Sequence, residues 1–350
     1  MGILILFLFA VAAYNLKLSP FHKDYMDKTS ADAVKGFFAV VILYSHMGKY
    51  LSFSNSFIDI LFEGFLTYLG QLMVVMYFFY SGYGLMESLR NKPNYQKTFF
   101  KSRFLKILLH FDIAVVLYIL LQSILGVQFA THIYIMSLIG WESVGNSNWF
   151  IFDILIFYIF FWLAVTCSNI VKIKFLSKYV IVFTIVAVLC VFLWFFLFVS
   201  KGQKWWVDSI FTFPLGIAYS LLKEEIDIIM NKTSVYYSVI LGGITLFVIW
   251  HYYQNVDVLG ISSCLFALIV AFLSMKMKIG NVILLWLGKQ AFAIYILQRL
   301  PMIILCHWGL NNYKFLFVSI TLLSVFIMAS VFTIFLNKID NSLFRIRNCR

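Results

Sequence analysis

A lysine and a histidine eleven positions apart are the side chains whose types and spacing most favour chemistry. Lys35 and His46 lie in the apolar segment KGFFAVVILYSHMGKY. In an α-helix, a step of that size returns to nearly the same face about 16 Å further along the axis. Ionisable side chains inside a bilayer are costly and usually face the bundle interior or a wet cavity. The pair therefore predicts a cation at one membrane edge and an imidazole near the midplane, both along one path.

A second set of chemically competent side chains is basic. Arg103, Lys106 and His110 fall at positions i, i+3 and i+7, and hence on one face of a helix. An arginine forms forked hydrogen bonds to phosphate oxygens, and a lysine acts as a point charge. The cluster predicts a site for a phosphorylated ligand. The alternative is that these cations bind lipid headgroups and determine the topology of the chain.

The chain that must position these residues has the composition of a membrane protein. Hydrophobic residues make up 63% of the 350 positions and charged residues 12%, and the mean hydropathy is +0.93. A soluble core could not bury so much apolar surface. Several stretches approach or exceed the roughly 18 to 20 apolar residues that cross a bilayer as a helix. The predicted fold class is an all-α polytopic membrane protein.

About eleven transmembrane helices are predicted from the apolar spans. The third and the tenth span are long enough to be tilted, broken or partly interfacial, and the first is short enough to be a signal-like segment. The spans cover residues 2–16, 35–52, 57–86, 103–127, 148–169, 179–200, 207–223, 234–252, 258–275, 281–307 and 314–336.

The 27 Lys and Arg residues divide unevenly between the two sides of these spans. If the N-terminus lies outside, 21 of them fall on one side and four on the other. Such a bias marks the richer side as cytoplasmic. The sequence thus predicts an N-terminus outside, a cytoplasmic C-terminus and a basic cluster that faces the cytoplasm. Because the net charge of +12 first reflects topology, we expect no nucleic-acid partner.

The five cysteines show no C-x-x-C spacing, and four of them lie in apolar segments. There they most simply pack as small hydrophobic residues. We therefore expect neither a disulfide framework nor a metal site.

Short motifs follow one another along the chain. They are the Lys35 to His46 spacing, YFFYSGYGL at 77–85, FKSRFLKI at 100–107, NWFI at 148–151, and LGKQA through YILQ at 287–298. In that order they resemble the Arg/Lys-x10-His, FF-x-x-SGF, F-x-x-R-x-x-R-I, H-x-WFL and LGK-x-S through YLLH motifs of the membrane acyltransferase-3 family. The chain departs from this pattern at Leu109, Ala291 and Gln298, where the family usually has proline, serine and histidine.

The resemblance implies an architecture and an activity. Residues 1–30 would form an extra N-terminal transmembrane helix and a cytoplasmic linker, 31–337 the ten-helix acyltransferase-3-like membrane domain, and 338–350 a basic cytoplasmic tail. The protein would lie in the cytoplasmic membrane as a multi-pass O-acyltransferase. It would move an acetyl group from cytosolic acetyl-CoA to a hydroxyl of a cell-surface polysaccharide, such as capsule or exopolysaccharide, or of its lipid-linked precursor.

The resemblance also implies roles for individual residues. His46 would take the proton of the acceptor hydroxyl as this attacks the thioester, and an acyl-His46 relay is the alternative. Lys35 and Asp153 would assist, with Asp153 orienting His46 or a sugar hydroxyl, or else making a buried hydrogen bond. The residues expected to bind acetyl-CoA are Lys35, Ser81, Gly82, Lys101, Arg103, Lys106 and His110. Those expected to bind the carbohydrate acceptor are Asn148, Trp149 and Gln298, although Trp149 also suits an interfacial anchor.

A function of another class remains open. A polysaccharide polymerase or flippase of the same envelope pathway would also be basic, Phe-rich and many-spanning. Membrane glycan polymerases commonly carry a large outer loop with acceptor-binding arginines. The longest predicted outer loop here, near 128–147, contains no Lys or Arg, which favours the transferase.

Overall fold

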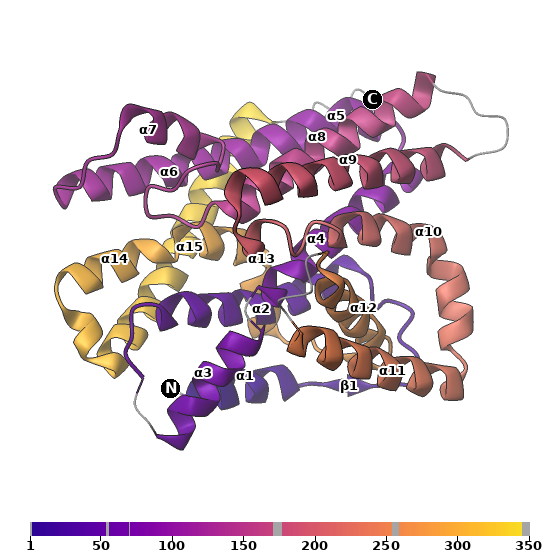
Figure 1. Ribbon diagram of the computed structural model, residues 1–350, viewed down its shortest axis with the longest axis horizontal. Helices are drawn as coiled ribbons and strands as arrows, with labels where there is room; N and C mark the ends of the chain where they lie inside the picture. Colours follow the sequence, from indigo (N-terminus) through magenta and orange to yellow (C-terminus); the bar gives the residue numbers. More distant parts are fainter. Residues whose placement is uncertain (1, 54–55, 70, 171–176, 254–258, 345–350) are drawn as a thin grey trace.

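The computed structural model describes residues 2–53, 56–69, 71–170, 177–253 and 259–344, which form a helical bundle (Figure 1). The elements are α1 (Gly2–Ala13), β1 (Lys17–Leu18), α2 (Lys28–Gly48), α3 (Phe57–Leu69), α4 (Leu72–Asn91), α5 (Tyr95–Phe99), the π-helical turn η1 (Phe100–Leu105), α6 (Lys106–Ile124), α7 (Thr131–Leu138), α8 (Trp149–Ile170), α9 (Lys178–Lys201), η2 (Lys204–Trp206), α10 (Thr212–Met230), α11 (Thr233–Tyr252), α12 (Ile261–Lys276), β2 (Met277–Lys278), α13 (Val282–Leu297), α14 (Arg299–His307), η3 (Leu310–Asn312) and α15 (Lys314–Leu343).

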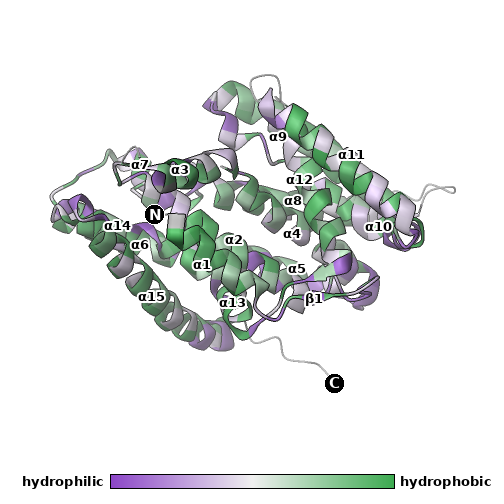
Figure 2. Ribbon diagram, turned by 90° about the horizontal axis from the view of Figure 1, so that it is seen from below, coloured by the Kyte–Doolittle hydropathy of each residue, from purple (hydrophilic) through white to green (hydrophobic). Residues whose placement is uncertain are grey.

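Several helices have the length and composition that a bilayer requires. Six helical stretches among the described residues are long and apolar enough to span, and a seventh span exists if α13 and α14 are counted together. Figure 2 shows hydrophobic residues along most of α9, α11 and α15. The chain is therefore a helical, multi-pass membrane protein. The predicted number of eleven spans and the predicted orientation stay predictions.

Four other helices, α1, α2, α10 and α12, are not counted as membrane spans, because they are either short or charged. Helices α1 and α12 are apolar but short. Helices α2 and α10 have 21 and 19 residues but carry several charged side chains along their length. In α2 these include Lys35, one of the two residues singled out from the sequence. Polar character in a helix of spanning length is expected where the helix lines a cavity inside the bundle.

The structure describes both of the long spans that were expected to be tilted, broken or partly interfacial. The third corresponds to α3 and α4. The tenth bends by 46° between α13 and α14. Gln298 lies at this bend, where its Nε2 donates a 3.1 Å hydrogen bond to the carbonyl oxygen of Tyr295. The expectation of a broken span is confirmed for the tenth, and for the third it stays a prediction.

Two pairs of helices approach closely at glycines. Gly36 of α2 faces Gly288 of α13, and Gly82 of α4 faces Gly216 of α10. At each of the four positions a Cβ atom would overlap a backbone carbonyl of the facing helix. Small residues at membrane helix interfaces allow backbones to approach in this way. These crossings place α2 and α4, the two helices that carry most of the candidate site, against α13 and α10.

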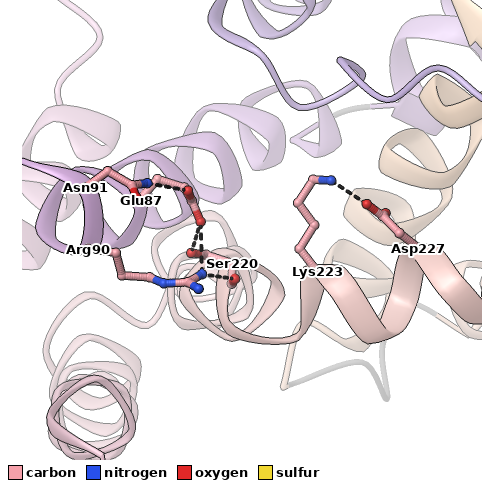
Figure 3. A network of polar contacts seen from close by, with 6 residues as sticks. All are labelled: Glu87, Arg90, Asn91, Ser220, Lys223 and Asp227. Atoms are coloured by element: carbon pink, nitrogen blue, oxygen red, sulfur yellow. Dashed lines mark hydrogen bonds and ion pairs between the residues drawn. The ribbon is translucent and has the colours of Figure 1, made fainter.

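A polar network joins the C-terminal end of α4 to the middle of α10 (Figure 3). The hydroxyl of Ser220 donates a 2.6 Å hydrogen bond to Oε1 of Glu87. Arg90 donates a 2.9 Å hydrogen bond to the carbonyl oxygen of Ser220, and Lys223 pairs with Asp227 at 2.5 Å. The network fixes the end of α4 on the side where Lys35 lies.

The segment between α1 and α2 is attached to the turn between α12 and α13. Strand β1 pairs in antiparallel fashion with β2, with Lys17 opposite Lys278. Lys278 also forms an ion pair with Asp24. The hydrogen bond from Lys278 holds the pKa of the Asp24 carboxyl below its usual range. This attachment closes the bundle beside the start of α2.

Candidate functional site

A cavity of about 710 Å³ lies at the end of α2 that carries Lys35, and we call it the inner cavity. Helices α2, α4, α8 and α13 and the turn η1 form its wall through Lys35, Ser81, Tyr158, Lys289 and Arg103. Its volume falls within the range of about 300 to 1,000 Å³ that is usual for ligand sites. The charged side chains that line it are Lys28, Lys35, Lys92, Arg103 and Lys289 on the basic side, and Asp27, Asp32 and Glu87 on the acidic side.

The predicted residues Lys35 and Ser81 both lie in the inner cavity with defined partners. The ammonium of Lys35 lies 2.6 Å from a carboxylate oxygen of Asp32, one turn earlier on α2. The hydroxyl of Ser81 lies 3.1 Å from the hydroxyl of Tyr158. Arg103 lines the same cavity and has no ion pair within the described part of the chain. Basic character in the cavity therefore comes from Arg103 as well as from Lys35.

Arg103 lies within the π-helical turn η1, whereas the next two basic residues of the predicted cluster, Lys106 and His110, lie on α6. Lys106 lies 2.5 Å from one carboxylate oxygen of Asp340 on α15, and Nε2 of His110 lies 2.9 Å from the other. Neither residue lines the inner cavity. Arg103 therefore lines the inner cavity whereas Lys106 and His110 contact α15, as a π-helical turn, with its wider register, changes the direction of the side chains beyond it. Binding of acetyl-CoA by Lys106 and His110 stays a prediction.

A second cavity of about 630 Å³ lies at the other end of α2, and we call it the outer cavity. It brings together three predicted residues, His46, Asn148 and Trp149. Nε2 of His46 lies 3.4 Å from the hydroxyl oxygen of Ser147. Asn148 donates a 2.8 Å hydrogen bond to the carbonyl oxygen of Gly140 and so fixes the loop that precedes α8. The imidazole thus lies in a cavity whose opposite wall is the start of α8.

The two cavities meet at a shared wall. Ile42, Val74 and Tyr295 line both of them. Lys35 and His46 lie on α2 on opposite sides of this wall. The structure therefore places the two residues in adjacent cavities of the bundle, with apolar and aromatic side chains between them.

Besides Lys106 and His110, four predicted site residues line neither cavity. Gly82 packs against the backbone of α10, and Lys101 is exposed. Gln298 is fully buried at the bend between α13 and α14. Asp153 is fully buried, and neither of its carboxylate oxygens has a hydrogen-bond partner among the described residues. It therefore does not orient His46 by a hydrogen bond in this structure, nor does it make the buried hydrogen bond that was the alternative.

The structure also brings residues to the site that the sequence reasoning did not assign. Lys49 and Arg299 line the outer cavity, and Lys289 lines the inner one. Two signals were present in the sequence. Lys49 follows His46 by three positions, which is one helical turn, and Lys289 and Arg299 are ionisable residues within a predicted apolar span. Ser147 carried no such signal, because its contact with His46 joins parts of the chain far apart in sequence.

The described residues form neither a metal site nor a disulfide. No group of three or more His, Cys, Asp or Glu side chains there could hold a metal ion. The described cysteines form no disulfide. Cys349 and the arginines of the predicted basic tail, from residue 345 on, lie outside the described residues.

Comparison with known proteins gives one match. A family model described as an acyltransferase domain, of the acyltransferase-3 type, matches residues 28–336. No curated protein and no solved structure matches the chain. The matched region begins at the first residue of α2 and includes both Lys35 and His46. Apart from Met26 and Asp27, it contains all the residues that line the inner and the outer cavity. Because the match extends over most of the chain, this protein belongs to the acyltransferase-3 family and is a membrane acyltransferase.

Proposed function

We propose that this acyltransferase moves an acetyl group from cytosolic acetyl-CoA to a hydroxyl of a cell-surface polysaccharide or of its lipid-linked precursor, and that it does so in the cytoplasmic membrane. One observation carries the proposal. A basic cavity and a cavity with a histidine share the wall formed by Ile42, Val74 and Tyr295. Two substrates on opposite sides of a bilayer need such an arrangement, since only the acyl group has to pass.

The inner cavity suits the donor. Acetyl-CoA carries several phosphate charges and cannot cross hydrocarbon. Arg103 would bind phosphate oxygens through its guanidinium fork, and Lys35 and Lys289 would act as point charges. The linear arm of the donor would then run along α2 toward His46, a distance of about 16 Å on the helix axis.

The chemistry at the outer cavity needs one base. His46 takes the proton of the acceptor hydroxyl while the oxygen attacks the thioester carbonyl. The new C–O bond forms as the C–S bond breaks, and the thiolate of CoA recovers the proton. In the alternative relay, a ring nitrogen of His46 first attacks the thioester, and the acceptor hydroxyl then attacks the acyl-imidazole. Both routes end with the acetyl ester and free CoA.

The family match favours this function over a polysaccharide polymerase or flippase, and one experiment separates them. Surface glycan would be isolated from a deletion strain, from the same strain complemented with the gene, and from one complemented with His46→Ala. NMR signals of O-acetyl groups should be lost on deletion, restored by the gene, and absent with His46→Ala, while glycan length stays the same. Shorter glycan with unchanged acetylation in the deletion strain would favour the polymerase or flippase instead. Full acetylation with His46→Ala would contradict the role of His46.

A further inference from the structure

We infer that the outer cavity binds an acceptor that carries a negative charge, a carboxylate or phosphate group of the glycan close to the reacting hydroxyl. The inference rests on the proposed function and names the class of its acceptor. It comes from the charges of the outer cavity, which the roles assigned to His46, Asn148 and Trp149 leave unexplained.

The outer cavity has more basic than acidic side chains. Lys49, Lys201 and Arg299 line it, and Glu142 is its only carboxylate among the described residues. Glu142 already has a partner, because its Oε1 lies 3.3 Å from the ammonium of Lys201. Two positive charges, those of Lys49 and Arg299, thus have no ion pair within the described part of the chain. A cleft lined by charges of one sign attracts ligands of the opposite sign.

Arg299 is held in place by neutral groups. Its guanidinium donates hydrogen bonds of 3.2 Å to the hydroxyl of Tyr50 and to the carbonyl oxygen of Asn146. These contacts fix its orientation but leave its charge without a counterion. Arginine and lysine side chains have only donors, so the ligand that complements them offers acceptor oxygens. Carboxylate and phosphate oxygens make the stronger, charge-assisted form of this bond.

Lys49 lies where an acceptor anion bound to it would be close to the imidazole of His46. Lys49 follows His46 by one turn of the helix path, and side chains three positions apart are neighbours on a helix surface, with Cβ atoms about 5 to 6 Å apart. An anionic group held by Lys49 would therefore fix a neighbouring hydroxyl beside the imidazole, and such positioning lowers the entropic cost of reaction. The half-exposed indole of Trp205 in the same cavity offers an apolar surface for a sugar ring.

Two of the tryptophans in the outer cavity contact Lys201, the lysine that already has an ion pair. The ammonium of Lys201 lies 3.8 Å from the ring centroid of Trp141 and 4.8 Å from that of Trp206. Its charge is thus balanced by Glu142 and by aromatic faces. This leaves Lys49 and Arg299 as the pair to which an incoming anion would bind.

The test measures acetyl transfer by the full chain in lipid nanodiscs with radiolabelled acetyl-CoA. The acceptor probe is surface polysaccharide from a deletion strain, used untreated, after reduction of its carboxylates to alcohols, or after removal of its phosphates, with the fractions matched in size. Transfer should fall at least about tenfold after one of the two treatments, as expected for a lost hydrogen bond to a charged group. Equal transfer to all three preparations would overturn the inference alone. No transfer to the untreated polysaccharide would contradict the proposed function, and the inference with it.

Matched variants test whether Lys49 binds the anionic group of the acceptor. Lys49→Gln should raise the KM for untreated polysaccharide about tenfold and leave the KM for the charge-depleted preparation unchanged. Lys49→Arg should restore the lower KM. Lys204→Gln is the control, since Lys204 is an exposed lysine of η2 that does not line the cavity, and its KM should match that of the original chain. A Lys49→Gln variant with an unchanged KM for untreated polysaccharide would overturn the inference.

Discussion

The imidazole of His46 and the hydroxyl of Ser147 lie in contact across the outer cavity, with Nε2 of the ring 3.4 Å from the hydroxyl oxygen. His46 belongs to α2, whereas Ser147 precedes α8, so the contact joins two separate parts of the bundle. A hydroxyl that hydrogen-bonds one ring nitrogen determines the orientation of the ring and which nitrogen carries the proton. Ser147 is therefore a positioning residue for His46.

Substitution of the two residues should have unequal effects on acetyl transfer. His46→Ala should lower kcat by at least about a hundredfold, because it removes the base. Ser147→Ala should lower kcat by about tenfold or less, since the base remains but its orientation is lost. Ser147→Thr, which keeps the hydroxyl, should recover most of the rate. Transfer from radiolabelled acetyl-CoA in isolated membranes measures all three, and a Ser147→Ala variant as inactive as His46→Ala would mean that the serine itself reacts.

The donor site should distinguish Lys35 from Lys101, two lysines that were both predicted to bind acetyl-CoA. Lys35 lines the inner cavity, whereas Lys101 is exposed and lies outside it. Lys35→Ala should raise the KM for acetyl-CoA about tenfold through loss of a charge-assisted contact, and Lys101→Ala should leave it within about twofold. Equal effects of the two substitutions on this KM would show that the donor phosphates extend beyond the inner cavity.

Lys106 should matter for stability and Arg103 for donor binding. Asp340 contacts both Lys106 and His110, and thereby joins α6 to α15. Asp340→Asn and Lys106→Ala should each lower the free energy of unfolding by about 1 kcal/mol while leaving the KM for acetyl-CoA unchanged. Arg103→Ala should raise that KM without a comparable loss of stability. Thermal unfolding in detergent, measured beside initial rates, separates the two, and a raised KM in Asp340→Asn would place the α15 contact within the donor site.

The sequence predicted the features that depend on spacing within one helix. Lys35 and His46 lie on one helix because the segment between them is uninterrupted and apolar. The length of the tenth span also indicated that it could be broken, but not that the bend lies at Gln298. The sequence did not predict the different surroundings of Arg103 and Lys106. Their surroundings differ across the π-helical turn η1, a departure from the α-helical spacing on which the prediction was based.

Contacts between segments far apart in the chain could not be predicted from the sequence either. Gly82 was predicted to bind acetyl-CoA because of the motif to which it belongs. In the structure its backbone instead packs against the facing helix α10, a neighbour that the sequence does not identify. Arg299 was visible as a charge in an apolar span. Its place beside His46 follows from the bend between α13 and α14, which only the three-dimensional arrangement shows.

The crossing of α4 and α10 should tolerate no side chain at Gly216. A Cβ atom there would overlap the carbonyl of Phe79, and relief requires the two helices to separate. Gly216→Val should cost about 1 to 3 kcal/mol of stability, or prevent folding. Gly242→Val in α11 is the matched control, since no atom lies within 4 Å of a Cβ at that glycine. Thermal unfolding of the two variants in the same detergent measures the difference, and equal stability would contradict the close approach of these helices.

The wall shared by the two cavities should control passage of the acyl group without controlling recognition of the donor headgroup. Ile42 lies in this wall with Val74 and Tyr295. Ile42→Trp adds bulk where the arm of the donor would pass, so acetyl transfer should fall by at least about tenfold, equivalent to about 1.4 kcal/mol in the barrier. Ile42→Leu, which conserves volume, should remain active.

Binding of adenosine 3′,5′-bisphosphate, which carries phosphates but no arm, should be unchanged in both variants, because the basic side chains of the inner cavity are untouched. Retained binding also shows that the tryptophan variant is folded. An Ile42→Trp variant with full transfer activity would mean that the acyl group crosses the bundle by another route.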